Sequence, residues 1–160
     1  LHKMSQTKVQ TPLVEALSFG VYLASDQGSV ANNTYTKLAF DAEFWDSNGA
    51  FASNKFTVPS GEGGKYLFTY RVKTSLIDDG EKVVGRIYKN GSGLAISETV
   101  NYSSASDQQV DALGSYSIDL AAADYIELYG LQTEGGNTTF FGGATDGCWF
   151  FGQKLVGIGD

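Results

Sequence analysis

The sequence is poor in the residues on which most catalytic and metal sites depend. Its 160 residues include one histidine, His2, and one cysteine, Cys148. We therefore expect no intrachain disulfide, no nucleophile paired with a histidine and no histidine-based metal site. Cys148 lies in an apolar run that continues Trp-Phe-Phe. This run predicts a small buried hydrophobic side chain, with a reactive thiol as the alternative.

Positive charge and long apolar runs are also scarce. The chain has 11 Lys and Arg residues against 18 Asp and Glu residues, a formal net charge of −7. Nucleic acids and anionic membrane surfaces require basic patches, so we expect neither as a partner. No apolar run approaches the roughly 20 residues of a membrane helix, and no apolar core of a signal peptide follows the first residues. We predict neither membrane insertion nor a signal peptide there.

Proline is rare, with 2 residues, whereas the sequence contains 20 glycines and 13% aromatic residues. This combination is typical of an all-β domain with many tight turns. Strict alternation over residues 64–70 places Tyr66, Phe68 and Tyr70 on one face of a strand. Three aromatic rings on one face predict a central strand that packs on the core.

Shorter alternating or apolar segments predict the other strands. They cover residues 19–24, 35–40, 55–58, 82–88, 98–102, 115–120, 125–131 and 149–155. No segment has capped helical periodicity, so we expect almost no helix. Eight to ten short strands with frequent turns indicate a sandwich, jelly roll or barrel in one domain, residues 17–160. The polar residues 1–16 are predicted to be a linker or tether.

One motif and the order of the strands resemble the globular head of complement component 1q, which is related to the tumour necrosis factor jelly roll. The positions of the motif are filled by Phe40, Asp46, Phe51, Gly64, Tyr66, Phe68 and Tyr70. The second Phe of the family would fall at Val58, and the nearest aromatic residue is Phe56. The resemblance continues through residues 85–90, 125–129 and 149–155, and it covers residues 17–157.

The resemblance implies a jelly-roll β-sandwich of about ten short antiparallel strands that forms a trimer. The aromatic content agrees, because a cyclic trimer needs an apolar wall on each protomer. The aromatic residues that we place at the core or at the trimer axis are Tyr66, Phe68, Tyr70, Tyr129 and Phe150. The sequence does not separate these two roles.

The acidic turn Asp78-Asp79-Gly80-Glu81 is the best candidate for a calcium site, since calcium takes carboxylate and carbonyl oxygens. The family that the chain resembles includes calcium-binding members, and a solvated acidic turn is the alternative. We predict no other cofactor.

Paired carboxylates leave one enzymatic alternative, the hydrolysis of a glycoside. Glu43 with Asp46, or Glu127 with Asp146, could form such a pair. Any acidic chain offers similar pairs, and we predict that the protein is not an enzyme.

Four Asn-x-Ser/Thr sequences begin at Asn32, Asn90, Asn101 and Asn137. In a eukaryotic secreted protein they would be glycan acceptors. The alternative is that turns are rich in these residue types.

These observations favour a non-enzymatic trimeric recognition or structural head. The leading setting is a viral or bacteriophage appendage: a fibre tip, a receptor-binding knob or a capsid decoration that binds a repetitive host surface by avidity. The alternative is a secreted complement-1q-like or cytokine-like protein that binds glycans, microbes or a receptor. The partner would be a second and third copy of the chain, together with a host-surface glycan, a protein receptor or a neighbouring virion protein. The location would be virion or extracellular.

Binding on such scaffolds is usually in the connections, so we place it in loops 78–81, 102–111 and 133–139. The candidate ligand-binding residues are Asp78, Asp79, Glu81, Tyr102, Asp107, Glu134 and Asn137.

Overall fold

The computed structural model describes residues 16–155, which form fourteen β-strands and one 3₁₀ turn. The strands are β1 (Ser18–Tyr22), β2 (Gln27–Val30), β3 (Thr36–Lys37), β4 (Ala42–Asp46), β5 (Phe51–Ala52), β6 (Lys55–Thr57), β7 (Gly64–Ile77), β8 (Lys82–Lys89), β9 (Ser92–Gly93), β10 (Thr99–Tyr102), β11 (Gln108–Leu120), β12 (Tyr125–Gln132), β13 (Thr138–Phe140) and β14 (Trp149–Lys154). The 3₁₀ turn is η1 (Ala95–Ser97). Over these residues there is no helix of the length and hydrophobicity needed to cross a membrane. The predicted linker over residues 1–16 lies outside the described residues except for Ala16.

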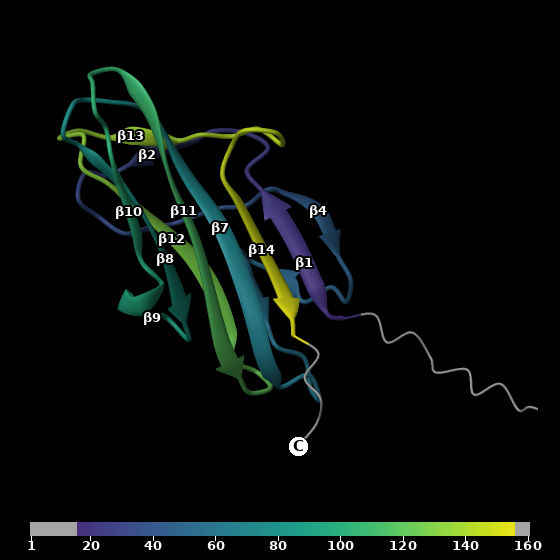
Figure 1. The fold of residues 1–160 in the computed structure, drawn as a ribbon. Coiled ribbons are helices and arrows are strands. Elements are labelled where there is room, and N and C mark those ends of the chain that lie inside the picture. The colour runs from purple at the N-terminus through teal and green to yellow at the C-terminus, as the bar shows by residue number, and fades with distance from the viewer. Residues whose placement is uncertain (1–15, 156–160) are drawn as a thin grey trace, which may run out of the picture.

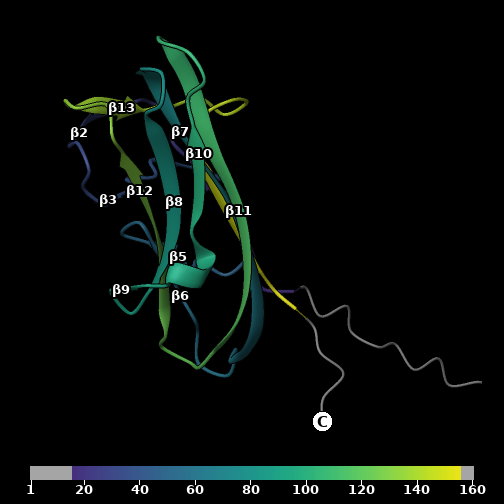
Figure 2. The same cartoon turned by 60° about the vertical axis from the view of Figure 1, so that its left-hand side comes forward.

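The strands form two packed sheets (Figures 1 and 2). The first sheet has the order β2-β13-β7-β14-β1-β4, with β11 also paired to β7. The second sheet has the order β10-β8-β12-β6-β5, with β3 paired to β12 and β9 paired to β8. All pairs of named strands are antiparallel. The architecture is a jelly-roll β-sandwich, as predicted.

The predicted central strand is the centre of the first sheet, but it is twice as long as expected. β7 spans 14 residues and pairs with β11 from Gly64 to Ile77. Its other edge pairs with β14 and then with β13. The prediction ended at Tyr70, whereas the inward positions continue through the buried residues Val72 and Thr74.

The core between the sheets is aromatic. Tyr66, Phe68 and Tyr70 of β7 and Phe150 of β14 are fully buried within the single protomer. The rings of Phe68 and Phe150 lie 5.7 Å apart, and Phe19 of β1 packs on Phe150 at 5.2 Å. Each buried ring contributes roughly 2–3 kcal/mol. Four of the five aromatic candidates are therefore core residues, and they are not available at a trimer axis.

Several predicted boundaries were wrong, and some strands were not predicted. The expected strand over residues 35–40 is reduced to Thr36–Lys37, and the strand expected over residues 115–120 begins at Gln108. Five strands have no counterpart in the predictions: β2, β4, β5, β9 and β13. β5, β9 and β13 have two or three residues, which is too short to display a period of two. The total is fourteen strands rather than ten.

The motif residues have clear structural roles. The Asp46 carboxylate closes the turn after β4, because it accepts hydrogen bonds from the amides of Ala50 at 3.1 Å and Phe51 at 2.8 Å. Phe56 and Val58 are both buried, and Phe56 stacks on Phe19 with ring centroids 5.0 Å apart. Phe56 therefore supplies an aromatic core ring although it lies two residues before the expected position.

The described chain enters and leaves the sandwich at the same place. β1 pairs with β14 so that Ser18 is opposite Gln153, and the Lys154 amide donates a hydrogen bond to the Leu17 carbonyl at 2.8 Å. β7 begins beside this point, because Tyr66 is opposite Lys154, and it ends at Ile77 at the other end of the molecule.

Candidate functional site

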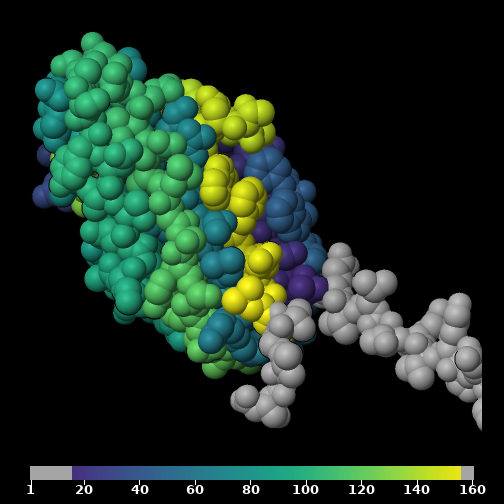
Figure 3. Space-filling view, viewed as in Figure 1, coloured from purple at the N-terminus to yellow at the C-terminus, as the bar shows by residue number. Residues whose placement is uncertain are grey.

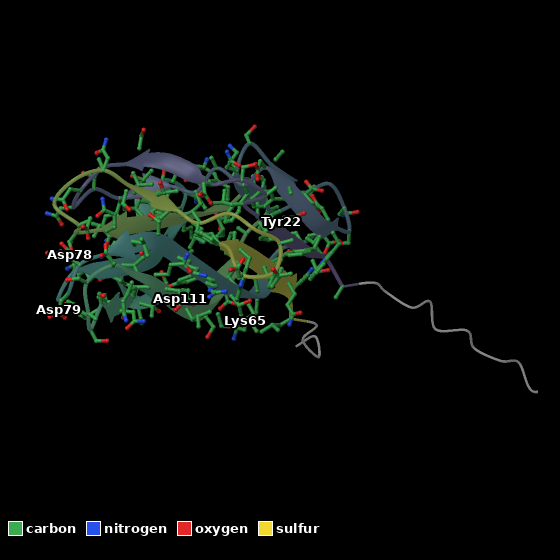
Figure 4. The ribbon with its side chains drawn as sticks, turned by 90° about the horizontal axis from the view of Figure 1, so that it is seen from above. Tyr22, Lys65, Asp78, Asp79 and Asp111 are labelled. Carbon is green, nitrogen blue, oxygen red and sulfur yellow. The ribbon has the colours of Figure 1, made fainter. Side chains whose placement is uncertain are left out.

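The three loops predicted to bind a partner meet at the end of the sandwich away from this point. The Ser103 amide donates a hydrogen bond to the Glu81 carbonyl, and the Asp78 amide donates one to the Glu134 carboxylate, each at 2.7 Å. Figure 4 shows Asp78 and Asp79 at this end. We call it the loop end, defined by residues 78–81, 103–107 and 133–137.

The loop end includes most of the candidate ligand-binding residues. Asp107 and Asn137 are exposed on its loops. Tyr102 is the last residue of β10, with 60% of its surface exposed. The predicted loop 102–111 is shorter than expected, because β11 begins at Gln108.

The acidic turn connects β7 of the first sheet to β8 of the second, and the chain's own backbone holds it. The Glu81 amide donates to the Asp78 carbonyl at 3.2 Å, and the Gly80 amide donates to the Ser103 carbonyl at 3.0 Å. Among residues 16–155, no three Asp, Glu, His or Cys side chains are grouped to hold a metal ion. Calcium binding by Asp78, Asp79 and Glu81 stays a prediction without a preformed site.

A surface that the sequence did not predict covers the outer face of the first sheet. The register between β1 and β4 shifts at a bulge, where Gly20 is opposite Trp45 and Val21 is opposite Glu43. A bulge turns successive side chains toward one side of a strand. Phe44 and Trp45 are both exposed, and both pack on Phe151 of β14, at 5.6 and 5.4 Å.

Two more rings extend this cluster. Tyr22 stacks on Phe44 at 4.4 Å, and Trp149 stacks on Phe151 at 4.7 Å. A Cβ atom at Gly20 would lie 2.7 Å from the Phe151 ring, so glycine is needed beneath it. We call the cluster the aromatic surface, defined by Tyr22, Phe44, Trp45, Trp149 and Phe151. Figure 3 shows this face, with the side chains of β14 in yellow between those of β7 and β1.

The aromatic surface borders a hollow of about 310 Å³. Its walls include Trp45, Phe151 and Leu67, and its polar groups come from Ser18, Thr69 and Gln153. The volume lies at the lower end of the range typical of small ligand pockets. One apolar side chain of a partner would fit there.

Exposed apolar side chains also lie along the edge where β10 of the second sheet meets β11 of the first. Val100, Tyr102 and Leu113 are all exposed, Leu113 by 56%. The Asn101 side-chain amide joins the two strands by donating to the Asp111 carbonyl at 2.9 Å. We call Val100, Tyr102 and Leu113 the apolar edge.

The remaining aromatic candidate, Tyr129, lies outside the core. It is half-buried on the second sheet, and its ring stacks on Tyr88 at 3.9 Å. It belongs neither to the aromatic surface nor to the apolar edge.

In each of the two carboxylate pairs proposed for catalysis, at least one carboxylate is engaged by other groups of the chain. Asp46 is engaged by the turn that it closes. Glu127 forms an ion pair with Lys37 at 2.6 Å, whereas Asp146 lies 3.5 Å from Lys73 in the loop before β14.

Cys148 is fully buried, as predicted. Burial raises the pKa of its thiol to about 12. The Lys73 amide donates a hydrogen bond to its sulfur at 3.1 Å. Thiolates are the reactive form of cysteine, so this side chain is inert in the folded protein.

The four Asn-x-Ser/Thr sequences differ in the state of the side-chain nitrogen to which a glycan would be attached. Asn90 donates to Asp124 at 2.7 Å, and Asn101 donates to the Asp111 carbonyl. Asn32 uses its oxygen to accept from the Gly135 amide, and Asn137 is exposed. Asn32 and Asn137 are therefore the more accessible candidates.

No protein-family model matches the sequence, and no curated protein matches it.

Solved structures do match over nearly the whole chain. The globular domain of zebrafish complement 1qA protein aligns with a TM-score of 0.58 at 15% identity, covering 88% of this chain and 98% of that one. Eiger TNF from S. frugiperda aligns with a TM-score of 0.63 at 12% identity, covering 91% and 96%. Murine APRIL aligns with a TM-score of 0.61 at 12% identity, covering 88% and 100%. At these identities the matches establish the fold alone.

Proposed function

Because the chain has the jelly-roll fold of the complement 1q head and of tumour necrosis factor ligands, we propose that it is a non-enzymatic recognition head that assembles as a homotrimer. The observation that carries this proposal is the pair of unlike apolar surfaces on one protomer, the aromatic surface and the apolar edge.

On one protomer the two surfaces are separated by β7, where Arg71 lies between Leu113 and Trp149, so in this proposal they pair between copies rather than within one. Contact between two different patches of identical chains is head-to-tail, and it closes into a ring when the rotation fits. Exposed contiguous aromatic residues are uncommon on monomeric proteins and mark interaction sites. The hollow beside Trp45 and Phe151 would receive a side chain of the neighbour's apolar edge.

In this assembly the loop ends of the three protomers carry the recognition residues. Three identical weak sites that engage a repetitive surface together multiply a modest affinity. The setting would be a virion or phage appendage, or a secreted head of the complement or cytokine type. Both settings use the same trimer and the same loops.

Light scattering on the purified chain tests the assembly. We expect a stable mass of three protomers, and we expect Phe44→Asp on the aromatic surface and Leu113→Asp on the apolar edge each to give monomers. The matched control is Ile96→Asp on η1, because Ile96 is 77% exposed but lies in neither surface. A monomeric wild-type chain would refute the trimer.

Light scattering also tests whether calcium binds at the acidic turn. If Asp78, Asp79 and Glu81 bind a calcium ion that supports assembly, a chelator will lower the mass and added calcium will restore it. An unchanged mass, together with no calcium binding in calorimetry, removes the metal from the proposal.

A further inference from the structure

A second aromatic cluster lies on the second sheet, and it consists of tyrosines. The rings of Tyr88 in β8 and Tyr129 in β12 stack at 3.9 Å. Tyr35, which precedes β3, packs edge-on against Tyr88 at 6.0 Å. All three side chains are half-buried, so each keeps part of its ring in solvent. We call Tyr35, Tyr88 and Tyr129 the tyrosine surface.

The charges beside these rings neutralise one another. The Arg86 guanidinium lies over the Tyr35 ring at 4.4 Å and forms an ion pair with Glu98. The Tyr35 hydroxyl donates a hydrogen bond to the same Glu98 carboxylate. Lys37 and Glu127 form a second ion pair at 2.6 Å on the neighbouring strands. The tyrosine surface is therefore polar without a net charge of its own, on a chain whose net charge is −7.

The nearest hairpin packs against one side of the Tyr88 ring. β8 and β9 are joined by a two-residue Asn90-Gly91 turn, and Gly93 follows in β9. A Cβ atom at Gly93 would lie only 3.0 Å from the Tyr88 ring. Because residue 93 is glycine, the Tyr88 ring packs directly on the β9 backbone, beside the Arg86 side chain.

The chemistry of the tyrosine surface differs from that of the aromatic surface. The aromatic surface is mainly Phe and Trp, which suits the apolar edge of another copy. Tyrosine combines a flat apolar ring with a hydroxyl that donates and accepts hydrogen bonds. A sugar ring has the matching properties, since it presents C–H groups on its faces and hydroxyls around its rim. Polyanions would be repelled by the net charge of the chain.

We propose that the tyrosine surface binds a neutral polysaccharide, with a sugar ring packed against the exposed parts of Tyr88 and Tyr129 and its hydroxyls hydrogen-bonded to the phenol groups of these two residues. This site is separate from the loop end. The interface of the proposed trimer uses the aromatic surface and the apolar edge and not the tyrosine surface, so three such sites would act together. That gain by avidity depends on the proposed function, whereas the single site does not.

Affinity electrophoresis through gels that contain galactomannan, mixed-linkage β-glucan or dextran tests the site, with heparin as the acidic comparison. We expect at least one neutral polymer to retard the wild-type protein and heparin not to do so. Tyr88→Ala and Tyr129→Ala should each weaken binding about tenfold or more, as for central aromatic contacts in other interfaces. The Asp78→Ala/Asp79→Ala variant at the loop end is the control and should bind normally.

Thermal unfolding and light scattering on every variant separate loss of the site from loss of the fold or of the trimer. If Tyr129→Ala unfolds, the Tyr129→Phe variant replaces it. Saturation-transfer NMR on the wild-type protein then tests the site directly, because sugar protons near the tyrosine rings give signals. A trimer that no neutral polymer retards would overturn the site, as would loss of binding only in the loop-end variant. A monomer that still binds through Tyr88 and Tyr129 would support the site and refute the avidity.

Discussion

Asn90 connects two strands with a single side chain. Its amide nitrogen donates to Asp124 at 2.7 Å, and its oxygen accepts from the Tyr125 amide at 2.8 Å. Its backbone has a φ of 51°, and with Gly91 it forms the two-residue turn between β8 and β9. Positive φ at both central residues is the requirement of the tightest hairpins, which Asn-Gly meets.

We predict that Asn90→Ala lowers the free energy of unfolding by about 1–3 kcal/mol, because the Tyr125 amide and the Asp124 carboxylate lose a partner and alanine resists positive φ. Urea unfolding measures the change. Asn137→Ala, at an exposed loop residue, is the control and should shift stability by less than about 0.5 kcal/mol. Equal effects of the two substitutions would contradict the anchoring role.

Two strands, β8 and β11, both lie close to the ring of the core residue Tyr70. A Cβ atom at Gly114 would lie 2.2 Å from the Tyr70 ring, and one at Gly85 would lie 2.3 Å from it. The Tyr70 hydroxyl lies within hydrogen-bond distance of two carbonyls across the core, Ser97 at 2.6 Å and Gly85 at 2.9 Å, which share its one proton. The two glycines thus leave the space that the Tyr70 ring occupies between the strands.

We predict that Gly114→Ala destabilises the protein by about 1–3 kcal/mol, because the added methyl overlaps a ring that its hydrogen bonds hold in place. Chemical unfolding and near-ultraviolet circular dichroism would report the loss of stability and of packing around Tyr70. Gly28→Ala, where a Cβ atom would meet nothing within 4 Å, should be nearly neutral. A neutral Gly114→Ala would mean that β11 moves away at little cost.

The alternation of apolar residues along the sequence predicted the strands that bury one face in the core. It did not predict apolar residues that lie on the outer face of the sheet. Tyr66, Phe68 and Tyr70 alternate and are buried, so the centre of the first sheet was predictable. Phe44 and Trp45 are adjacent in sequence, and only the bulge places both on the outer face. The signal that the sequence offered for the aromatic surface was this pair of adjacent aromatic residues in a short edge segment.

The interaction surfaces depend on strand pairing, which the sequence does not encode locally. The tyrosine surface needs residues 35, 88 and 129 from three strands or their flanks to meet. The loop end likewise depends on contacts such as that of Asp78 with Glu134, which are 56 residues apart. The candidate loops were chosen one by one from their composition, and only the topology brings them together.

The stability of the whole molecule depends on alkaline pH, because one thiol and two tyrosine hydroxyls are buried in their protonated forms. Burial raises the pKa of Cys148 from 9.0 to about 12, and burial, with Glu62 nearby, raises that of Tyr66 from 10.0 to about 12. Burial also raises the pKa of Tyr70. In the unfolded chain these groups release their protons at lower pH. Their contribution to stability is therefore complete below pH 9 and is lost as the pH rises from about 9 to about 12.

We predict a lower free energy of unfolding at about pH 10.5 than at about pH 7.5, measured with urea. Cys148→Ala should reduce the difference between the two values even though it removes packing. Tyr102→Phe changes an exposed tyrosine and should leave the difference unchanged. Stability that stays constant or rises over this interval would show that the buried groups do not control the response.

The antiparallel pairing of β1 with β14 has a practical consequence for engineering. Because Ser18 lies opposite Gln153, a short linker could join residue 155 to residue 16 without distorting either strand. A circular permutant could then be opened at the Asp79-Gly80 peptide bond of the exposed turn between β7 and β8. By the same geometry the sandwich could be inserted into a surface loop of another protein as a self-contained cassette, with the loop end carried at the far tip.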